Sequence, residues 1–282
     1  MDNSPFLFGT VGAPLSTPKK PGGSVGAIQT LASLGLYAFE LGWVQSVRVT
    51  EETCFAIKKT ASEYSVHLSV HAPYFINLNA NAEEWPKSRK RLMDAAHYGY
   101  LAGATDIIFH PGSYFNVDPD QVIPLVVSRL RECVRELRVD GNPVTLRPET
   151  MGKKSMLGSL EDTLTMSAEI DGVEPCLDFA HLHARAGDGT MNTKEEWLEV
   201  LEKYEKSLGK EALSRLHIHM SGIEYSEKGE RNHLKISDSD FNLVDLFEAL
   251  HEAGARGRIV CESPVLEEDA LYMMEKWHIL FG

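Results

Sequence analysis

The sequence predicts an α/β fold, a single (β/α)8 TIM barrel spanning residues 1–282. Strand-like and helix-like segments alternate along the whole chain, and no break in this alternation marks a domain boundary. Strands separated by helices of this length imply right-handed crossovers and a parallel sheet, and eight such units suggest that the sheet closes. The length of 282 residues also fits one such barrel better than two ordinary domains.

Eight strand and helix units can be placed in order along the chain. The expected strands cover residues 6–11, 37–42, 67–72, 105–111, 144–150, 174–181, 215–221 and 257–263. The expected helices cover about residues 24–34, 51–64, 85–102, a segment opening at residue 118, and then 160–169, 194–207, 243–253 and 267–278. The third helix has Leu92, Ala95 and Ala96 at helical spacing. The fourth opens with Asp118 as a cap before Pro119.

Three connections after expected strands are long or borderline long for a compact domain. They cover residues 72–84, 185–193 and 222–241. Loops of such length tend to be functional. Because all three follow the C-terminal ends of strands, we expect them to lie over one mouth of the barrel and to shape a substrate groove.

Six of the expected strands end in a residue that can bind a divalent metal. In chain order these residues are His71, His110, Glu149, Asp178, His217 and Glu262. Taken singly, each is more often a satisfied polar residue or a helix cap than a ligand. The C-terminal strand ends of a parallel barrel converge on one face, however, and buried carboxylates are costly unless they are paired or bound to metal. The joint pattern therefore predicts a metal cluster at the C-terminal mouth.

The mixture of ligand types restricts the metal and the chemistry. Histidine together with carboxylate suits zinc, or manganese and iron with less preference, and argues against calcium, which takes oxygen ligands. Three carboxylates are also enough to bridge metals. A polynuclear site of this kind is used mainly for the hydrolysis of phosphate esters.

The net charge of −13 bears on the class of partner. Phosphate binding is driven largely by Lys and Arg, which release condensed counterions, so an acidic chain would ordinarily disfavour nucleic acid. Bound divalent cations would change this charge balance, because they add local positive charge that the formal net charge leaves out. Their carboxylate ligands also make the formal net charge more negative. A polyanionic substrate is therefore compatible with the sequence.

The cysteines and the first residues bear on the compartment. Cys54, Cys133, Cys176 and Cys261 show no C-x-x-C spacing, so we expect reduced core residues rather than disulfides or a thiolate zinc site. The segment MDNSPFLFGTVGAP lacks a basic region followed by an apolar stretch. No apolar run approaches the roughly 20 residues of a membrane span. We expect a cytoplasmic protein without membrane association.

These motifs together resemble the endonuclease IV family of apurinic/apyrimidinic endonucleases, within the wider xylose-isomerase-like barrels. The resemblance covers nearly the whole chain. Its motifs are SVHAPYFINL around His71, IIFHPGS around His110, RPETMGK around Glu149, CLDFAHLHARAGD around Asp178 and His181, LHIHMSG around His217, and VCESP around Glu262. The resemblance implies a monomeric hydrolase that cuts double-stranded DNA on the 5′ side of abasic sites, as in base excision repair.

The resemblance also implies a trinuclear zinc site and a role for each ligand. Glu149 would bridge two metals, the first also held by His71 and His110 and the second by Asp178, His217 and Glu262, while His181 would hold a third. Glu149 would in addition be the catalytic residue that orients or deprotonates the attacking water. Two zinc ions are implied by this set and a third is possible, with Mn²⁺ and Fe²⁺ as alternatives.

The third metal is where this chain departs from the family, which offers an Asp-x-His pair after the seventh strand. Here the sequence reads GERNHLKI, so Glu230 and Asn232 occupy the simplest aligned positions and His233 follows one residue later. Glu230 and His233 could serve with a local shift of the chain, His183 or His219 could substitute, or the third site could be weak. His219 faces the same way as His217, two residues away, and equally fits a barrel-interior histidine.

A second departure concerns contacts to DNA. In the family, the segment after the second strand carries polar and basic residues that contact DNA, whereas in this chain it reads LGWVQSVRVT. Trp43 in it could stack on a base or simply pack. Tyr74 matches a tyrosine that lines the DNA-facing surface in the family, with a loop anchor as its structural alternative. Lys153 and Lys154, after the fifth strand, could reach the backbone of a duplex.

Arg147 lies two residues before Glu149, so both side chains should face the barrel interior. It could contact phosphate, or it could pair with the inward-facing Glu40.

Two other functions remain open from the sequence, because a fold does not set its function. Sugar isomerases and epimerases on the same barrel tend to use one metal held by two glutamates, an aspartate and one histidine. The additional histidines His71, His110 and His181 weigh against this function, and the missing DNA-contact loop weighs for it. A metal-stabilised lesion-binding protein without turnover is the third alternative.

Overall fold

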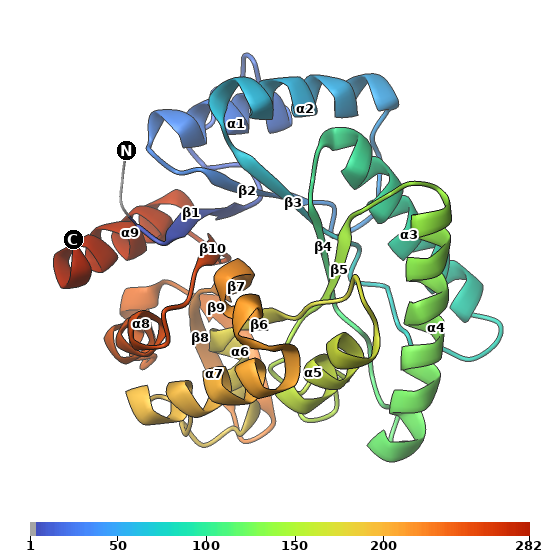
Figure 1. Cartoon of the computed structure of the whole chain (residues 1–282). Coiled ribbons are helices and arrows are strands. Elements are labelled where there is room, and N and C mark those ends of the chain that lie inside the picture. The colour runs from blue at the N-terminus through green and yellow to red at the C-terminus, as the bar shows by residue number, and fades with distance from the viewer. Residues whose placement is uncertain (1–3) are drawn as a thin grey trace.

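Eight parallel strands form the centre of the molecule (Figure 1). The computed structural model describes residues 4–282, so residues 1–3 of the expected domain lie outside the described part. The strands are β1 (Phe6–Val11), β2 (Ala38–Gly42), β3 (His67–His71), β4 (Asp106–Phe109), β5 (Thr145–Pro148), β6 (Cys176–Asp178), β7 (Leu216–Met220) and β10 (Gly257–Cys261). In space they follow the order β5-β4-β3-β2-β1-β10-β7-β6. Two parallel bridges, Leu146 with Val173 and Glu149 with Cys176, then connect the β5 side to the β6 side. The sheet is a nearly closed barrel, and the predicted (β/α)8 TIM barrel is confirmed.

Helices surround this barrel (Figure 1). They are α1 (Gly23–Ser33), α2 (Glu51–Tyr64), α3 (Trp85–Ala102), α4 (Pro119–Val139), α5 (Leu160–Glu169), α6 (Phe179–Arg185), α7 (Lys194–Leu208), α8 (Leu243–Glu252) and α9 (Glu267–Phe281). Short 3-10 helices at Lys210–Arg215 and Ile236–Asp238 precede β7 and α8. Within residues 4–282, no helix is both long enough and apolar enough to cross a membrane.

Helix α7 illustrates how local sequence sets these elements. The hydroxyl of Thr193 accepts a hydrogen bond from the amide of Glu196, whose carboxylate in turn accepts one from the amide of Thr193. This capping box satisfies amides that have no partner inside the helix. Trp197, Leu201 and Tyr204, at helical spacing, are buried in the hydrophobic core that lies around the barrel.

The expected strand over residues 174–181 is too long. Strand β6 ends at Asp178, and α6 begins at the next residue. The side-chain Oδ1 of Asp178 accepts a hydrogen bond from the amide of His181 at 2.6 Å. An aspartate that caps the first turn in this way stabilises a helix start, which explains why the chain turns away from the sheet here.

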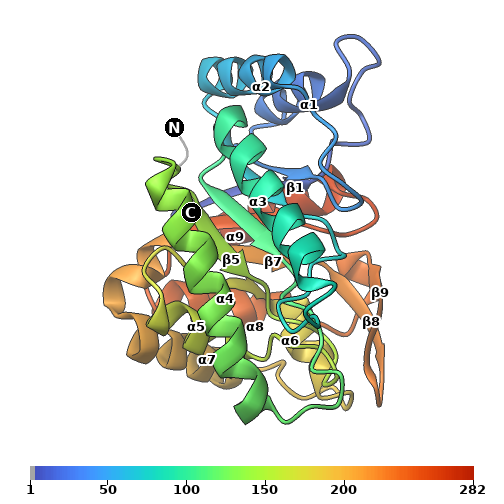
Figure 2. The ribbon, with the colours of Figure 1, turned by 90° about the vertical axis from the view of Figure 1, so that its right-hand side faces the viewer.

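The long connection expected over residues 222–241 contains secondary structure that was not predicted from the sequence. This segment contains an antiparallel hairpin of β8 (Gly222–Ser226) and β9 (Gly229–Leu234). Ile223 of the hairpin packs against Ala180 and Ala184 of α6. Figure 2 shows the hairpin beside α6, at the edge of the molecule. The segment is therefore a hairpin packed against α6 beside the barrel mouth.

Candidate metal centre

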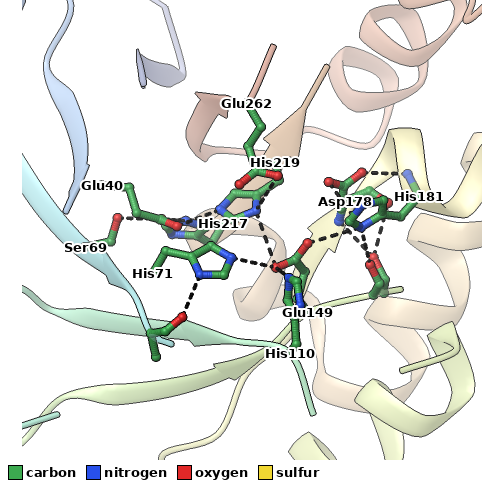
Figure 3. Close-up of polar contacts among 12 residues, drawn as sticks. Glu40, Ser69, His71, His110, Glu149, Asp178, His181, His217, His219 and Glu262 are labelled. Carbon is green, nitrogen blue, oxygen red and sulfur yellow. Dashed lines mark hydrogen bonds and ion pairs between the residues drawn. The ribbon is translucent and has the colours of Figure 1, made fainter. Parts of the chain in front are cut away.

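The structure brings together five of the six strand-end residues expected from the sequence (Figure 3). They are His71, His110, Glu149, Asp178 and Glu262. His71 ends β3, Asp178 ends β6, and the other three follow directly on β4, β5 and β10. Glu149 lies at the centre of the group and is fully buried. The convergence follows from the parallel strands, whose C-terminal ends meet at one mouth.

His71, His110 and Glu149 form the first group of potential ligand atoms. The Nε2 atoms of His71 and His110 lie 3.3 and 3.4 Å from Oε2 of Glu149. The Nδ1 atom of His71 lies 3.0 Å from the backbone oxygen of Ala72, which can only accept a hydrogen bond. This contact assigns one ring proton to Nδ1, so Nε2, which faces Glu149, is the atom that would exchange its proton for a metal.

A second group consists of Glu149, Asp178, His219 and Glu262, whose ligand atoms lie within 4.8 Å of one another. The Nδ1 atom of His219 is 3.7 Å from Oε2 of Glu149 and 3.5 Å from Oε2 of Glu262. Within residues 4–282, Oε1 of Glu149, Oδ2 of Asp178 and Nδ1 of His219 are buried and have no hydrogen-bond partner. Unsatisfied buried polar atoms are rare in native proteins. Their concentration at this mouth fits a site that a metal completes.

The member from β7 is His219 and not the expected His217. Both face the barrel interior, but Nε2 of His217 lies deeper, 2.8 Å from Oε2 of Glu40. His219 is two residues nearer the C-terminal end of the strand and so lies nearer the mouth. His219 thus lies in the group with Glu149, Asp178 and Glu262, whereas the expected His217 lies in a group with Cys176 and His219. The signal was present in the His-x-His spacing, in which the later histidine lies closer to the C-terminal face.

Glu40 was not expected to contribute to this region. It is fully buried on β2 and contacts His217 and His219. Burial raises the pKa of the Glu40 carboxyl, but these two histidines outweigh burial and hold the pKa well below its usual value. The carboxylate is therefore charged inside the barrel.

Arg147 does not pair with Glu40, contrary to one of the two expectations for it. It forms ion pairs with Asp106 and Glu174 and donates to the backbone oxygens of Pro175 and Arg215. The latter two precede β6 and β7, so the guanidinium lies at the end of the barrel opposite the mouth. With its donors engaged in these contacts, Arg147 is not placed to bind a phosphate at the mouth.

A third group adjoins the second and consists of Asp178, His181 and His233. The Nε2 atom of His181 lies 3.3 Å from Nε2 of His233 and 3.6 Å from Oε2 of Glu230. The other ring nitrogens, Nδ1 of His181 and Nδ1 of His233, face the backbone oxygens of Thr150 and Glu262 at 2.9 and 3.3 Å. Metal-binding histidines commonly direct their second nitrogen to such an acceptor. The two rings thus direct Nε2 toward each other, and Nδ1 of His181 also lies 3.3 Å from Oδ2 of Asp178.

A shift of register in the hairpin explains how Glu230 and His233 reach the same side. Tyr225 pairs with Glu230 and Glu224 pairs with Asn232, so Arg231 is one residue too many on β9. Side chains alternate along a regular strand, and residues three apart would face opposite ways. The extra residue of a bulge cancels one alternation. This bulge is the local shift that the sequence left open as one of its alternatives.

The hairpin also approaches the loop after β5 closely. The amide of Glu230 donates to the backbone oxygen of Gly152 at 2.9 Å. A Cβ atom on Gly152 would lie 2.6 Å from Cβ of Glu230 and 3.1 Å from the ring of His181. Glycine at this position therefore lets Glu230 lie beside His181.

His183 does not belong to the third group. Its Nε2 lies 3.1 Å from Oδ1 of Asp240, and its Nδ1 lies 3.2 Å from the backbone oxygens of Thr190 and Met191. Tyr225 donates to the other carboxylate oxygen of Asp240 at 2.5 Å. These contacts connect α6 to the hairpin, so the structure places His183 in a structural link.

Burial and mutual charge shift the acid–base properties of the mouth in the metal-free protein. Burial lowers the pKa of His71, but the hydrogen bond and charge of Glu149 outweigh it and raise the pKa to about 9. Burial raises the pKa of Asp178 to about 6, although His181 opposes the shift. Burial likewise raises the pKa of Glu149, but His110 and the other histidines hold it well below its usual value. Protons and carboxylates thus neutralise one another where cations would bind.

The residues expected to contact DNA are placed differently from one another. Tyr74 is 46% exposed, and its ring stacks on that of His110 with 5.0 Å between centroids, so it lies at the mouth. Trp43 is partly buried and packs against the hydrophobic core. Lys154 is exposed and donates to the backbone oxygen of Ala186, and Lys153 is partly exposed beside it. Tyr74 is thus the candidate in direct contact with the metal-site residues.

A parallel barrel with histidines and carboxylates gathered at its C-terminal mouth is the class of protein that this fold and site define. A family model described as xylose isomerase-like TIM barrel matches residues 28–277, and the chain belongs to this family.

Individual relatives refine this assignment. The chain is 37% identical over 276 residues to an uncharacterized protein of Methanocaldococcus jannaschii, and the match covers 98% of both chains. It is 28% identical over 206 residues to Endonuclease 4 of Thermus thermophilus, which covers 71% of this chain and 72% of that protein. The resemblance to the endonuclease IV family, inferred from the motifs, is confirmed by these similarities.

Solved structures show the same fold. A crystal structure of endonuclease IV from Thermus thermophilus superposes with a TM-score of 0.73 at 22% identity, covering 96% of this chain and 98% of that one. A D-tagatose 3-epimerase-like protein superposes with a TM-score of 0.70 at 19% identity, covering 96% of both chains. At these identities the likeness establishes the barrel and leaves the substrate open.

Proposed function

We propose that this protein is a metal-dependent phosphodiester hydrolase that cuts double-stranded DNA on the 5′ side of abasic sites. The observation that carries the proposal is that three of the five potential ligand groups of the described residues adjoin one another: the first and second share Glu149, and the second and third share Asp178. A single metal needs only one such group. The similarity to proteins named Endonuclease 4 points to the same chemistry.

The residues present fit a multinuclear centre. One metal would be held by His71, His110 and Glu149, a second by Glu149, Asp178, His219 and Glu262, and a third by His181 and His233 with Asp178 and Glu230. Mixed imidazole and carboxylate ligands favour Zn²⁺, with Mn²⁺ and Fe²⁺ as the other ions to test. When bound there, such ions would supply Lewis-acid stabilisation of a phosphodiester and make water acidic enough to attack near neutral pH.

The side chains around these ligands would contribute orientation. Glu149 is central and fully buried, so we assign it the orientation and deprotonation of the attacking water. Tyr74 presents a half-exposed ring beside His110, where it can stack on the sugar or base next to the lesion. Lys153 and Lys154 lie in the loop after β5 and would neutralise backbone phosphates. An abasic nucleotide has no stacked base, so it leaves the helix at low cost.

The decisive experiment uses metal-loaded protein and a duplex that contains one tetrahydrofuran abasic analogue. We expect incision on the 5′ side of the analogue, leaving a 3′ hydroxyl, and no cutting of the intact duplex. The Glu149→Gln variant should lose about 10²- to 10⁴-fold in turnover, the range for a positioned acid–base group. Absence of incision by the loaded wild-type protein would overturn the proposal.

A second candidate function has one specific observation in its favour. The group of Glu149, Asp178, His219 and Glu262 consists of two glutamates, one aspartate and one histidine, the set expected for sugar isomerases and epimerases of this barrel. Against it stand His71, His110, His181 and His233, which a single-metal enzyme does not need. A panel of ketoses and aldoses in the same assay separates the two. Sugar turnover that survives His71→Ala and His181→Ala, without DNA incision, would favour the epimerase.

A further inference from the structure

Glu40 is a buried carboxylate beside the proposed metal ligands His71 and His219 (Figure 3). Its Oε2 atom accepts a hydrogen bond from Oγ of Ser69 at 2.8 Å and lies 2.8 Å from Nε2 of His217. Its Oε1 atom lies 3.0 Å from Nε2 of His219, which is an ion-pair distance without the geometry of a hydrogen bond. Burying a charge costs a large free energy unless partners compensate for it. Three partners surround this carboxylate, and one of them is a proposed ligand.

The orientation of His219 differs from that of the other histidines in the cluster. His71 and His233 each direct Nδ1 to a backbone oxygen and present Nε2 to the site. His181 directs Nδ1 both to the backbone oxygen of Thr150 and to the carboxylates of Glu149 and Asp178. His219 has the reverse orientation, with Nδ1 toward Glu149 and Glu262 and Nε2 toward Glu40. A side-chain carboxylate thus occupies the place that a backbone oxygen takes for the other rings.

We propose that Glu40 is a positioning residue, which keeps the proton of His219 on Nε2 and directs the Nδ1 lone pair into the ligand group at the mouth. Ser69 and His217 hold the second carboxylate oxygen and so fix the direction of the first. A carboxylate that accepts from a metal-binding histidine fixes the tautomer and makes the ring a stronger ligand. The inference rests on the proposed metal centre but not on the DNA substrate.

The direct test compares Glu40→Gln with wild type in metal affinity, measured by competition against a chromophoric chelator with Zn²⁺ alone. The variant should keep the ion held by His71, His110 and Glu149, and should bind the ion of the His219 group about 10- to 100-fold more weakly, the usual effect of losing such a partner. Ser69→Ala removes one of the two contacts that hold Oε2, so it should weaken binding of the same ion by less than Glu40→Gln does. Wild-type affinity in Glu40→Gln would overturn the proposal.

A merely structural role for Glu40 predicts a different result. Loss of a packing partner would lower the melting temperature equally with and without Zn²⁺, whereas loss of ligand orientation lowers the increment that Zn²⁺ adds. Co²⁺ substitution gives a second readout, because weaker coordination by His219 changes the visible absorption of the ion. If Glu40→Gln does not fold, Glu40→Asp is used instead, because it keeps the charge on a shorter side chain. The rise in melting temperature that Zn²⁺ causes is then compared between this variant and wild type.

The wild-type protein provides a measurement that needs no variant. In the Zn²⁺-loaded form, nitrogen-15 spectra of the histidine rings should show His219 with a proton on Nε2 and metal at Nδ1. Metal at Nε2 of His219 would contradict the proposal. A protein that shows the expected tautomer and affinities but does not cut abasic DNA would leave this inference standing and overturn only the proposed substrate.

Discussion

Glu230 and His233 lie three residues apart in one strand, yet both face His181. Oε2 of Glu230 and Nε2 of His233 approach Nε2 of that histidine to 3.6 and 3.3 Å. The register shift at Arg231 makes this possible by adding one residue to β9. The chain therefore arranges a glutamate and a histidine on one face despite a spacing that a regular strand would not allow.

The bulge leads to a test by deletion. Removing Arg231 leaves Glu230 and His233 two residues apart, so a regular strand would again place them on one face. We expect the deletion variant to bind as many Zn²⁺ ions per chain as wild type, counted by elemental analysis. His233→Ala, the matched control, should lose the ion of the third group. An equal loss in both variants would show that the bulge itself, rather than the shared face, is required.

The two histidines of β7 should respond differently to substitution. His219→Ala removes the Nδ1 atom that faces Glu149 and Glu262, so the ion of the second group should be lost. His217→Gln leaves that atom in place and keeps a donor toward Glu40, so its metal content should match wild type. Elemental analysis after gel filtration measures both. The reverse outcome, with loss only in the His217 variant, would restore the original sequence-based assignment.

Metal affinity should depend on pH. In the metal-free protein Glu149 raises the pKa of His71 to about 9 against the effect of burial, so below that pH a cation must displace a proton. We expect the affinity for Zn²⁺ to fall as the pH decreases from about 9 to 6. Calorimetry at one pH in buffers of different ionisation enthalpy should detect proton release on binding. A Zn²⁺ affinity that does not change over this pH range would contradict the competition between the cation and the proton of His71.

The opposite end of the barrel should control stability in acid. Burial raises the pKa of Asp106, but Arg147 and Arg258 outweigh it and lower the pKa below its usual value. The stabilisation by Asp106 is therefore fully present above about pH 4, the pKa of an unfolded aspartate, and is lost as the pH falls toward the lowered value. Asp106→Asn should reduce the free energy of unfolding by about 3 to 5 kcal/mol at pH 7, because it leaves the buried guanidinium of Arg147 with Glu174 as its remaining ion-pair partner.

Urea unfolding between pH 3 and 7 measures this effect. The slope of stability against pH at the acidic end should be smaller in Asp106→Asn than in wild type. Glu84→Gln is the matched control, because Glu84 forms an exposed pair with Lys87 that contributes little. Identical slopes in the Asp106 variant and wild type would show that other carboxyl groups dominate acid unfolding.

Much of the fold and part of the site could be predicted because they depend on local pattern. Alternating strand and helix signals fixed the order of the barrel, and strand ends gave His71, His110, Glu149, Asp178 and Glu262 as neighbours. The helix start at Asp178 and the hairpin after β7 were missed, since a capping aspartate and a short antiparallel pair leave weak periodic signals.

The sequence by itself determined the barrel and the set of histidines and carboxylates at its mouth, because strand polarity alone directs those ends to one face. Tertiary structure decided which of His217 and His219 reaches the mouth, how Glu230 and His233 come to one side, and that Glu40 contacts histidines while Arg147 contacts Asp106. The physical reason is that depth inside a barrel and the face of a bulged strand depend on the register between neighbouring strands. Register is set by pairing between distant segments and leaves no local trace in the chain.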